Sequence, residues 1–228
     1  MNQYIILLGD LISRPKYAFN QIEQQTLSAW FPFFIVNLSL LIFWSLYFSM
    51  IDTQWLINMT LSESLPQASE QERQALAREM TPEVIKYSSV FGSQLMLMLQ
   101  GLLAAAYLNI ATKLDTENTD SFKNWYGFYW WLQIPVIFQL GLAIIVLLFS
   151  EDGQASLYQL QITSLNQLLN LAPGQPLYSF AASFDFFSLW TFVLLFYGLS
   201  IKTQLKTATI GYICFIPVLM MIAFSLLF

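Results

Sequence analysis

Few residues of this chain carry side chains suited to acid–base, nucleophilic or metal chemistry. The 228 residues include no histidine and one cysteine, Cys214, which lies inside an apolar run. The chain therefore lacks the commonest general base and the commonest metal ligand. The paired acids Glu70/Glu72 and Glu151/Asp152 lie in polar loops, where charged side chains are usually hydrated surface. We therefore predict no catalytic, cofactor-binding or metal-binding residue and no enzyme activity.

Five long apolar runs with almost no charged residues make up most of the chain and must position any functional residues. The chain is 57% hydrophobic and only 10% charged, against roughly 25% charged residues in soluble domains. A helix needs about 20 apolar residues to cross the hydrocarbon core, and its backbone must be satisfied within the segment. We predict an all-α membrane protein, a five-transmembrane-helix bundle with short interfacial and periplasmic helices. The predicted spans are about 30–50, 90–111, 128–149, 186–201 and 209–228.

We expect a single membrane domain over residues 1–228, with 1–29 as a cytoplasmic interfacial segment. The net charge of −5 argues against nucleic acid, which needs a basic footprint. Lys and Arg in short loops set orientation and mark the cytoplasmic side. The predicted location is a bacterial inner membrane, with the amino terminus cytoplasmic and the carboxyl terminus periplasmic. Three basic pairs share the cytoplasmic side if every run spans: Arg14 with Lys16, Lys113 with Lys123, and Lys202 with Lys206.

The amino-terminal segment contains a helix-start signal. Ser13 is a candidate N-cap, and Pro15 suits a first helical turn, where its missing N–H costs nothing. From there Tyr17, Phe19 and Ile22 alternate with polar residues. The pattern predicts an interfacial amphipathic helix, and the alternative is an irregular tail with some helix.

Two further cap signals lie in the first outer loop. Ser69 and Glu72 have the spacing of a capping box. Thr81 and Pro82 form an N-cap followed by proline at the first helical position. These signals predict a short polar helix near Glu70–Glu79 and a long helix from Pro82 that becomes the second span.

The second outer loop, 150–185, is rich in Leu, Gln and Ser. Leucines between Leu157 and Leu169 fall on one helical face, and the proline and glycine at 173–176 would end such a helix. Two interpretations stay open: a helix lying on the outer interface, or a loop packed over the bundle.

No ionisable residue lies inside the five runs, and Asp185 is predicted at the outer edge of the fourth. Ionisable residues inside the membrane mark transport, so this absence argues against a proton-coupled pump. Pro135 and Pro217 should kink their spans. The intramembrane polar residues either hydrogen-bond between helices or line a path. They are Asn37, Ser39, Gln94, Gln100, Asn109, Gln133, Gln139 and Thr191.

Small residues predict two close helix contacts. Gly101, with Ala104–Ala106, offers a small patch on the second span. Trp190 and Gly198 lie eight residues apart, on one side of the fourth span, and are predicted to form a contact within the bundle. The aromatic cluster at 125–131 is predicted to be the cytoplasmic interface belt of the third span.

Two segments resemble a known family. From Asp185 to Ser200 the chain has Ser188 and Trp190 near its start and Gly-Leu-Ser at its end, before a short basic turn. This segment resembles the fourth-span signature of bacterial Yip-domain (Ypt-interacting-protein type) membrane proteins. Arg14-Pro15-Lys16-Tyr17-Ala18-Phe19 resembles the family's amino-terminal Arg-Pro…Phe stretch. The resemblance covers nearly the whole chain and marks Arg14, Pro15 and Phe19 as interaction residues.

The resemblance implies a non-enzymatic accessory or scaffold protein. Bacterial members are linked to MacB-type ABC exporters with a membrane-fusion adaptor, whereas eukaryotic members are tied to small GTPases. We therefore expect an inner-membrane accessory protein whose partners are membrane lipid, an ABC exporter with its adaptor, and further copies of itself. The alternative is a small transporter or lipid-handling channel. An intramembrane enzyme is the weakest interpretation, because no nucleophile–base pair is visible.

Overall fold

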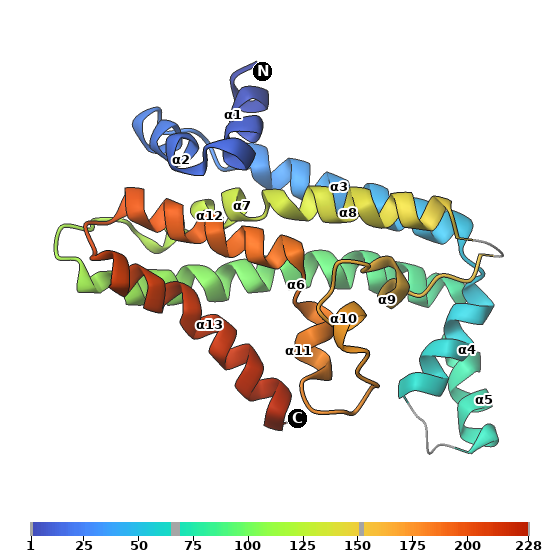
Figure 1. The fold of residues 1–228 in the computed structure, drawn as a ribbon. Helices are drawn as coiled ribbons and strands as arrows, with labels where there is room; N and C mark the ends of the chain where they lie inside the picture. Colours follow the sequence, from blue (N-terminus) through green and yellow to red (C-terminus); the bar gives the residue numbers. More distant parts are fainter. Residues whose placement is uncertain (1, 65–68, 151–152, 228) are drawn as a thin grey trace.

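The computed structural model describes residues 2–64, 69–150 and 153–227, and these residues form helices joined by turns and loops (Figure 1). The all-α prediction is therefore confirmed. In chain order the helices are α1 (Asn2–Ser13), α2 (Pro15–Gln24), α3 (Trp30–Met50), α4 (Thr53–Ser64), α5 (Glu70–Glu79), α6 (Pro82–Ala111), the 3₁₀ turn η1 (Thr112–Leu114), α7 (Phe122–Leu132), α8 (Ile134–Leu148), α9 (Leu157–Leu160), α10 (Asn166–Leu169), α11 (Tyr178–Ser183), α12 (Phe186–Lys202) and α13 (Thr207–Leu227).

Four helices of the described chain are long and apolar enough to cross a bilayer. The fourth predicted span forms α12, which has 17 residues. At ~1.5 Å per residue it is about 25 Å long, short of the ~30 Å hydrocarbon core. Five full spans are therefore not established. The four long candidates are Trp30–Met50, Pro82–Leu114, Phe122–Leu148 and Thr207–Leu227.

Helices α3, α6 and the α7–α8 pair pack side by side, and α12 begins partway along them (Figure 1). At one end lie α2, the loop before α7 and the loop after α12. Helices α4 and α5 lie at the opposite end, and α13 angles away from α12. The third predicted span is broken as expected at Pro135, because Gln133 separates α7 from α8. In contrast, α13 runs unbroken through Pro217.

The amino-terminal helix exists, but its predicted cap is wrong. Ser13 ends α1, and its hydroxyl donates to the carbonyl of Gly9 at 2.9 Å. Arg14 occupies the N-cap of α2 without a side-chain cap bond, and Pro15 takes the first helical position. A serine at the end of one helix serves that helix's own carbonyl, as serine hydroxyls often do. The buried face of α2 packs on α12.

Both cap signals predicted between the first and second spans are confirmed. The Ser69 hydroxyl accepts from the N–H of Glu72, whose carboxylate accepts from the N–H of Ser69. Thr81 caps α6 by accepting from the N–H of Val84. Helix α4 was not predicted, although Asp52 caps it by accepting from the N–H groups of Gln54 and Trp55. Its apolar side chains bury against α5 and α6.

Of the two interpretations left open for Leu157–Leu169, the interfacial helix is wrong, because the segment forms two single turns, α9 and α10, joined by a loop. The chain between them is held by backbone bonds to the start of α12. Leu165 N–H donates to the Phe184 carbonyl at 2.8 Å, and Phe186 N–H donates to the Thr163 carbonyl at 3.3 Å. These bonds remove the helical geometry that leucine spacing alone favours.

The predicted aromatic belt is also wrong. Trp125, Trp130 and Trp131 are each at most 2% exposed, and Phe128 and Tyr129 are 4% exposed. Side chains of an interface belt face lipid, whereas these fill the space between α7 and its neighbours α6, α3 and α12. The cluster is therefore core packing at one end of the bundle.

Candidate functional site

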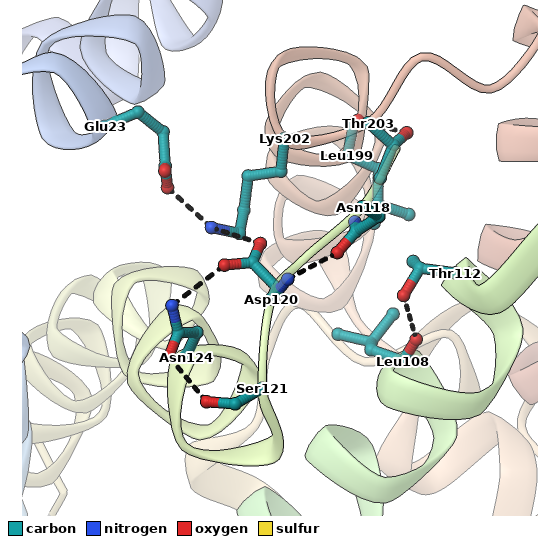
Figure 2. Close-up of polar contacts among 10 residues, drawn as sticks. All are labelled: Glu23, Leu108, Thr112, Asn118, Asp120, Ser121, Asn124, Leu199, Lys202 and Thr203. Atoms are coloured by element: carbon teal, nitrogen blue, oxygen red, sulfur yellow. Dashed lines mark hydrogen bonds and ion pairs between the residues drawn. The ribbon is translucent and has the colours of Figure 1, made fainter. Parts of the chain in front are cut away.

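The last turn of α12 carries a buried cation. The Lys202 side chain is 4% exposed, and its Nζ lies 2.7 Å from Glu23 Oε1 and 2.9 Å from Asp120 Oδ2 (Figure 2). Glu23 comes from α2 and Asp120 from the loop before α7. One ammonium group therefore joins three segments that are distant in sequence. A buried ammonium is tolerated only when it is paired in this way.

Aromatic rings complete the surroundings of Lys202. Its Nζ lies 5.3 Å from the ring centroid of Trp125 and 5.8 Å from that of Phe128. Both distances are within the range of a cation–π attraction. Beside this cluster is a cavity of about 420 Å³ whose walls include Lys123, Asn124 and Lys202. Two carboxylates meet one buried ammonium, so the cluster has an excess of negative charge.

The loop before α7 is fixed by its own side chains. Asn124 donates to the Asp120 carboxylate at 2.9 Å, and the Asp120 N–H donates to Asn118 Oδ1 at 2.8 Å (Figure 2). The buried Asp115 carboxylate accepts from the Gln204 N–H at 2.8 Å. The loop before α7 is thus bound to the loop after α12, and Lys202 sits where the two meet.

Gly198 lies one turn before Lys202 and allows α12 to approach α7. A Cβ built at Gly198 would lie 2.5 Å from Cε2 of Phe128, closer still to its Cζ, and 3.4 Å from Cε1 of Phe19. The Phe19 and Phe128 rings are themselves 5.5 Å apart. Phe19, predicted as an interaction residue, is 1% exposed and therefore packs within the chain.

The remaining predicted site residues lie in separate places. A Cβ at Gly101 would lie 2.8 Å from the Tyr129 ring, so Gly101 permits the close α6–α7 contact. Trp190 packs against Phe138 of α8, with ring centroids 5.3 Å apart. Arg14 and Pro15 begin α2 at the surface. The structure therefore brings Gly198 and Phe19 together and keeps the other four apart from them.

Sequence reasoning missed the Lys202 cluster. Lys202 was used only to predict membrane orientation, and no sequence pattern links Glu23 or Asp120 to it. The available signal was the Trp125–Phe128 pair next to a short acidic loop, which suits a buried cation. No group of three or more His, Cys, Asp or Glu suited to a metal ion is found in the part of the chain that is described.

Asp185 lies at the edge of the fourth predicted span, as the N-cap of α12, but its side chain is buried. Its carboxylate accepts from the N–H and hydroxyl of Ser188 at 2.7 and 2.8 Å, and from Gln139 Nε2 at 2.7 Å. Gln139 lies about 13 Å along the helix axis from Leu148, the end of α8. Asp185 is 4% exposed at the N-cap of α12, which packs against α8. An ionisable side chain does lie within the bundle, because α12 starts partway along it.

The Ser188 hydroxyl beside the Asp185 carboxylate belongs to the capping box of α12. The Lys202 ammonium is bound by carboxylates, and the Asp185 carboxylate is occupied by hydrogen-bond donors as the N-cap of α12. Both arrangements hold segments together. Their chemistry is that of structural ion pairing and capping.

Comparison with protein-family models decides the family. The model of the Yip1 domain matches residues 9–227. The chain belongs to the Yip1 domain family. The match includes both Arg14–Phe19 and Asp185–Ser200, so the family resemblance seen in the sequence is confirmed. Comparison with curated proteins and with solved structures finds no match. The residues of the Lys202 cluster lie within the matched Yip1 domain. The chain is thus a membrane protein of this family with several apolar helices.

Proposed function

We propose that this Yip1-domain protein is a non-enzymatic accessory protein that acts by binding another membrane protein. The observation that carries the proposal is an exposed apolar face on the part of α6 outside the bilayer. Helix α6 has 30 residues, or ~45 Å, about 15 Å more than the hydrocarbon core. On the turns before the predicted span at 90–111, Val84 is 51% exposed and Tyr87 59%. Apolar side chains exposed to water rather than lipid are typical of a protein interface.

This face has a rigid base. Ile85, on the opposite side of the same turns, is 8% exposed and packs with Leu56, Ile57 and Leu61 of α4. The Tyr87 and Phe91 rings stack, with centroids 6.3 Å apart. The exposed side chains are therefore held in place before a partner binds, which lowers the entropy cost of binding.

The partner we propose is a MacB-type ABC exporter with its adaptor, as the family resemblance suggests. The test is affinity purification from mild detergent, with the co-purifying subunits identified and quantified. Replacing both Val84→Ser and Tyr87→Ser should lower the exporter recovered at least about tenfold, because truncating an aromatic anchor at the centre of an interface costs about 2 kcal/mol or more. The control Lys86→Gln changes an exposed polar residue of the same turns and should leave recovery unchanged. If wild type and all variants recovered the same amount of exporter, the exposed face of α6 would not be the binding surface.

We also propose a bacterial inner-membrane location, with α2 and Lys202 at the cytoplasmic end. The basic residues of three short segments support this orientation. Reporter fusions after Lys206 should be active in the cytoplasm. A periplasmic signal from that position would reverse the orientation.

A small transporter is the second candidate, and Asp185 is the observation that favours it. Acids inside a membrane often mark ion pathways. The test is gradient-driven proton or substrate flux by the purified protein alone in sealed vesicles. Saturable flux that Asp185→Asn abolishes would support the transporter and refute the accessory function. Under the accessory proposal, wild type and Asp185→Asn both show no flux.

A further inference from the structure

A basic groove lies where the start of α2 meets the last turns of α12. It has a volume of about 790 Å³ and is separate from the cavity beside Lys202. Among the described residues, its lining contains two basic side chains and no carboxylate. The lining includes Arg14, Lys16, Tyr17 and Asn20 of the amino-terminal segment and Tyr197 and Ile201 of α12.

The Arg14 guanidinium is held in place at this groove. Its Nη2 lies 2.6 Å from Oδ1 of Asp10, and its Cζ lies 5.1 Å from the ring centroid of Tyr17. The Asp10 side chain is 9% exposed and that of Arg14 66% exposed. The carboxylate therefore lies on the protein side, and the open side of the guanidinium can donate to a ligand. Lys16 adds a second exposed cation, with no ion pair to any described residue.

An apolar stripe leads from the groove along α12. Phe186 is 61% exposed, Leu189 53%, Val193 47% and Tyr197 37%. Their spacing of three or four residues places them on one face of the helix. Tyr197 belongs both to the stripe and to the groove. A charged recess is therefore continuous with a membrane-facing apolar surface.

We propose that this surface binds an anionic phospholipid. The lipid phosphate lies in the groove against Arg14 and Lys16, and the acyl chains lie along the α12 stripe. Guanidinium and ammonium groups are the side chains that recognise phosphate. A ligand with only one of the two characters would leave half of this surface uncovered, whereas a phospholipid covers both. The site does not depend on which protein partner the chain has, nor on which leaflet it faces.

The test uses the full chain, purified in detergent and depleted of lipid. Binding of a fluorescent phosphatidylglycerol analogue is compared with that of the matching phosphatidylcholine analogue. Wild type should prefer the anionic lipid. Lys16→Gln should weaken phosphatidylglycerol binding about 5-fold, the equivalent of ~1 kcal/mol for one basic side chain at an anionic surface. Lys113→Gln, an equal charge change at an exposed position outside the groove, should leave binding unchanged.

The outcomes separate a phospholipid site from a free-anion site and from a general effect of net charge. Arg14→Gln would leave the buried Asp10 carboxylate unpaired and could unfold the protein. Lys16 is exposed and forms no ion pair with a described residue, so Lys16→Gln should fold, and its lipid binding is the result that tests the proposal. Equal binding of the two lipids would overturn the proposal, as would equal weakening by Lys16→Gln and Lys113→Gln. Displacement of the lipid by millimolar inorganic phosphate would overturn it too, because it would indicate a free-anion site. Retention of the lipid against phosphate, with loss in Tyr197→Ala, supports the proposed acyl path.

Discussion

Replacing Gly198 with alanine measures how tightly α12 approaches α7 at the candidate site. The new methyl would lie 2.5 Å from Cε2 of Phe128, well inside contact distance. The ring cannot easily move, because Phe128 is 4% exposed and packs on Phe19 and Trp125. Overpacking of this kind costs about 1–3 kcal/mol, against a gain of roughly 0.5–1 kcal/mol for replacing a helical glycine. The expected net destabilisation is up to about 2.5 kcal/mol.

Gly211→Ala is the matched control. Gly211 lies in α13, and a Cβ built there has no neighbouring atom within 4 Å. The control retains the helix-propensity gain without the clash, so the two variants should differ by about 1–3 kcal/mol. For a chain of this size that corresponds to roughly 2–12 °C in the unfolding midpoint. The assay is thermal unfolding in one detergent, followed by tryptophan fluorescence. If both variants unfolded at the same temperature, the α12–α7 contact would be looser than described.

Other perturbations test two of the buried charged residues, Lys202 and Asp185, and one helix cap. Lys202→Met should lower the free energy of unfolding by about 2 kcal/mol. This is less than the roughly 3–5 kcal/mol lost when a fully buried pair is broken, because the Glu23 side chain is 40% exposed. The control Lys206→Met, at an exposed site, should leave the free energy of unfolding unchanged in the same assay. Asp185→Ala should lower the free energy of unfolding by about 2–4 kcal/mol, because α12 loses its cap and the hydrogen bonds of the carboxylate. Asp185→Asn retains a good N-cap and should lower it by less than half as much. Equal losses in the two variants would show that the charge matters more than the cap. Hydrogen bonds from the backbone N–H of Ser69 and, second, from its hydroxyl lower the pKa of Glu72. The stabilisation that ionised Glu72 gives α5 is therefore present at neutral pH and is lost as the pH falls from the ordinary glutamate range through the lowered pKa. Circular dichroism between about pH 7 and 3 should show that helix content is less sensitive to acid in Glu72→Gln than in wild type.

Two of the three predicted helix-start signals were correct, and the Ser13 cap was wrong. The Ser69 capping box and the Thr81-Pro82 start are confirmed because each depends on backbone groups within a few residues. The apolar runs correctly marked the long helices, since lipid requires helical backbone. Non-local pairing could not be predicted in this way. The bonds between 163–165 and 184–186 replaced the helix that leucine spacing favoured, and only the folded chain brings these segments together.

The candidate site shows the same limit. Gly198 was predicted to lie in a helix contact, but its neighbours Phe128 and Phe19 could not be identified from the sequence. Burial of Lys202 depends on Glu23, which is 179 residues away in the chain. Charges at the ends of predicted spans are usually assigned to the aqueous interface, so neither Lys202 nor Asp185 was expected to be buried. Distance in sequence concealed the partners of Lys202 and the Gln139 partner of Asp185, whereas the cap that joins Asp185 to Ser188 is local.

The composition of the intact complex released from membranes in mild detergent tests the proposed accessory function most directly. Native mass spectrometry of the affinity-purified wild-type protein gives the subunits and their ratio in one experiment. We predict a defined stoichiometric complex of this Yip1-domain protein with another membrane protein, with the exporter and its adaptor as the expected subunits. Recovery of the chain alone, together with saturable flux by that chain in sealed vesicles, would contradict the accessory function.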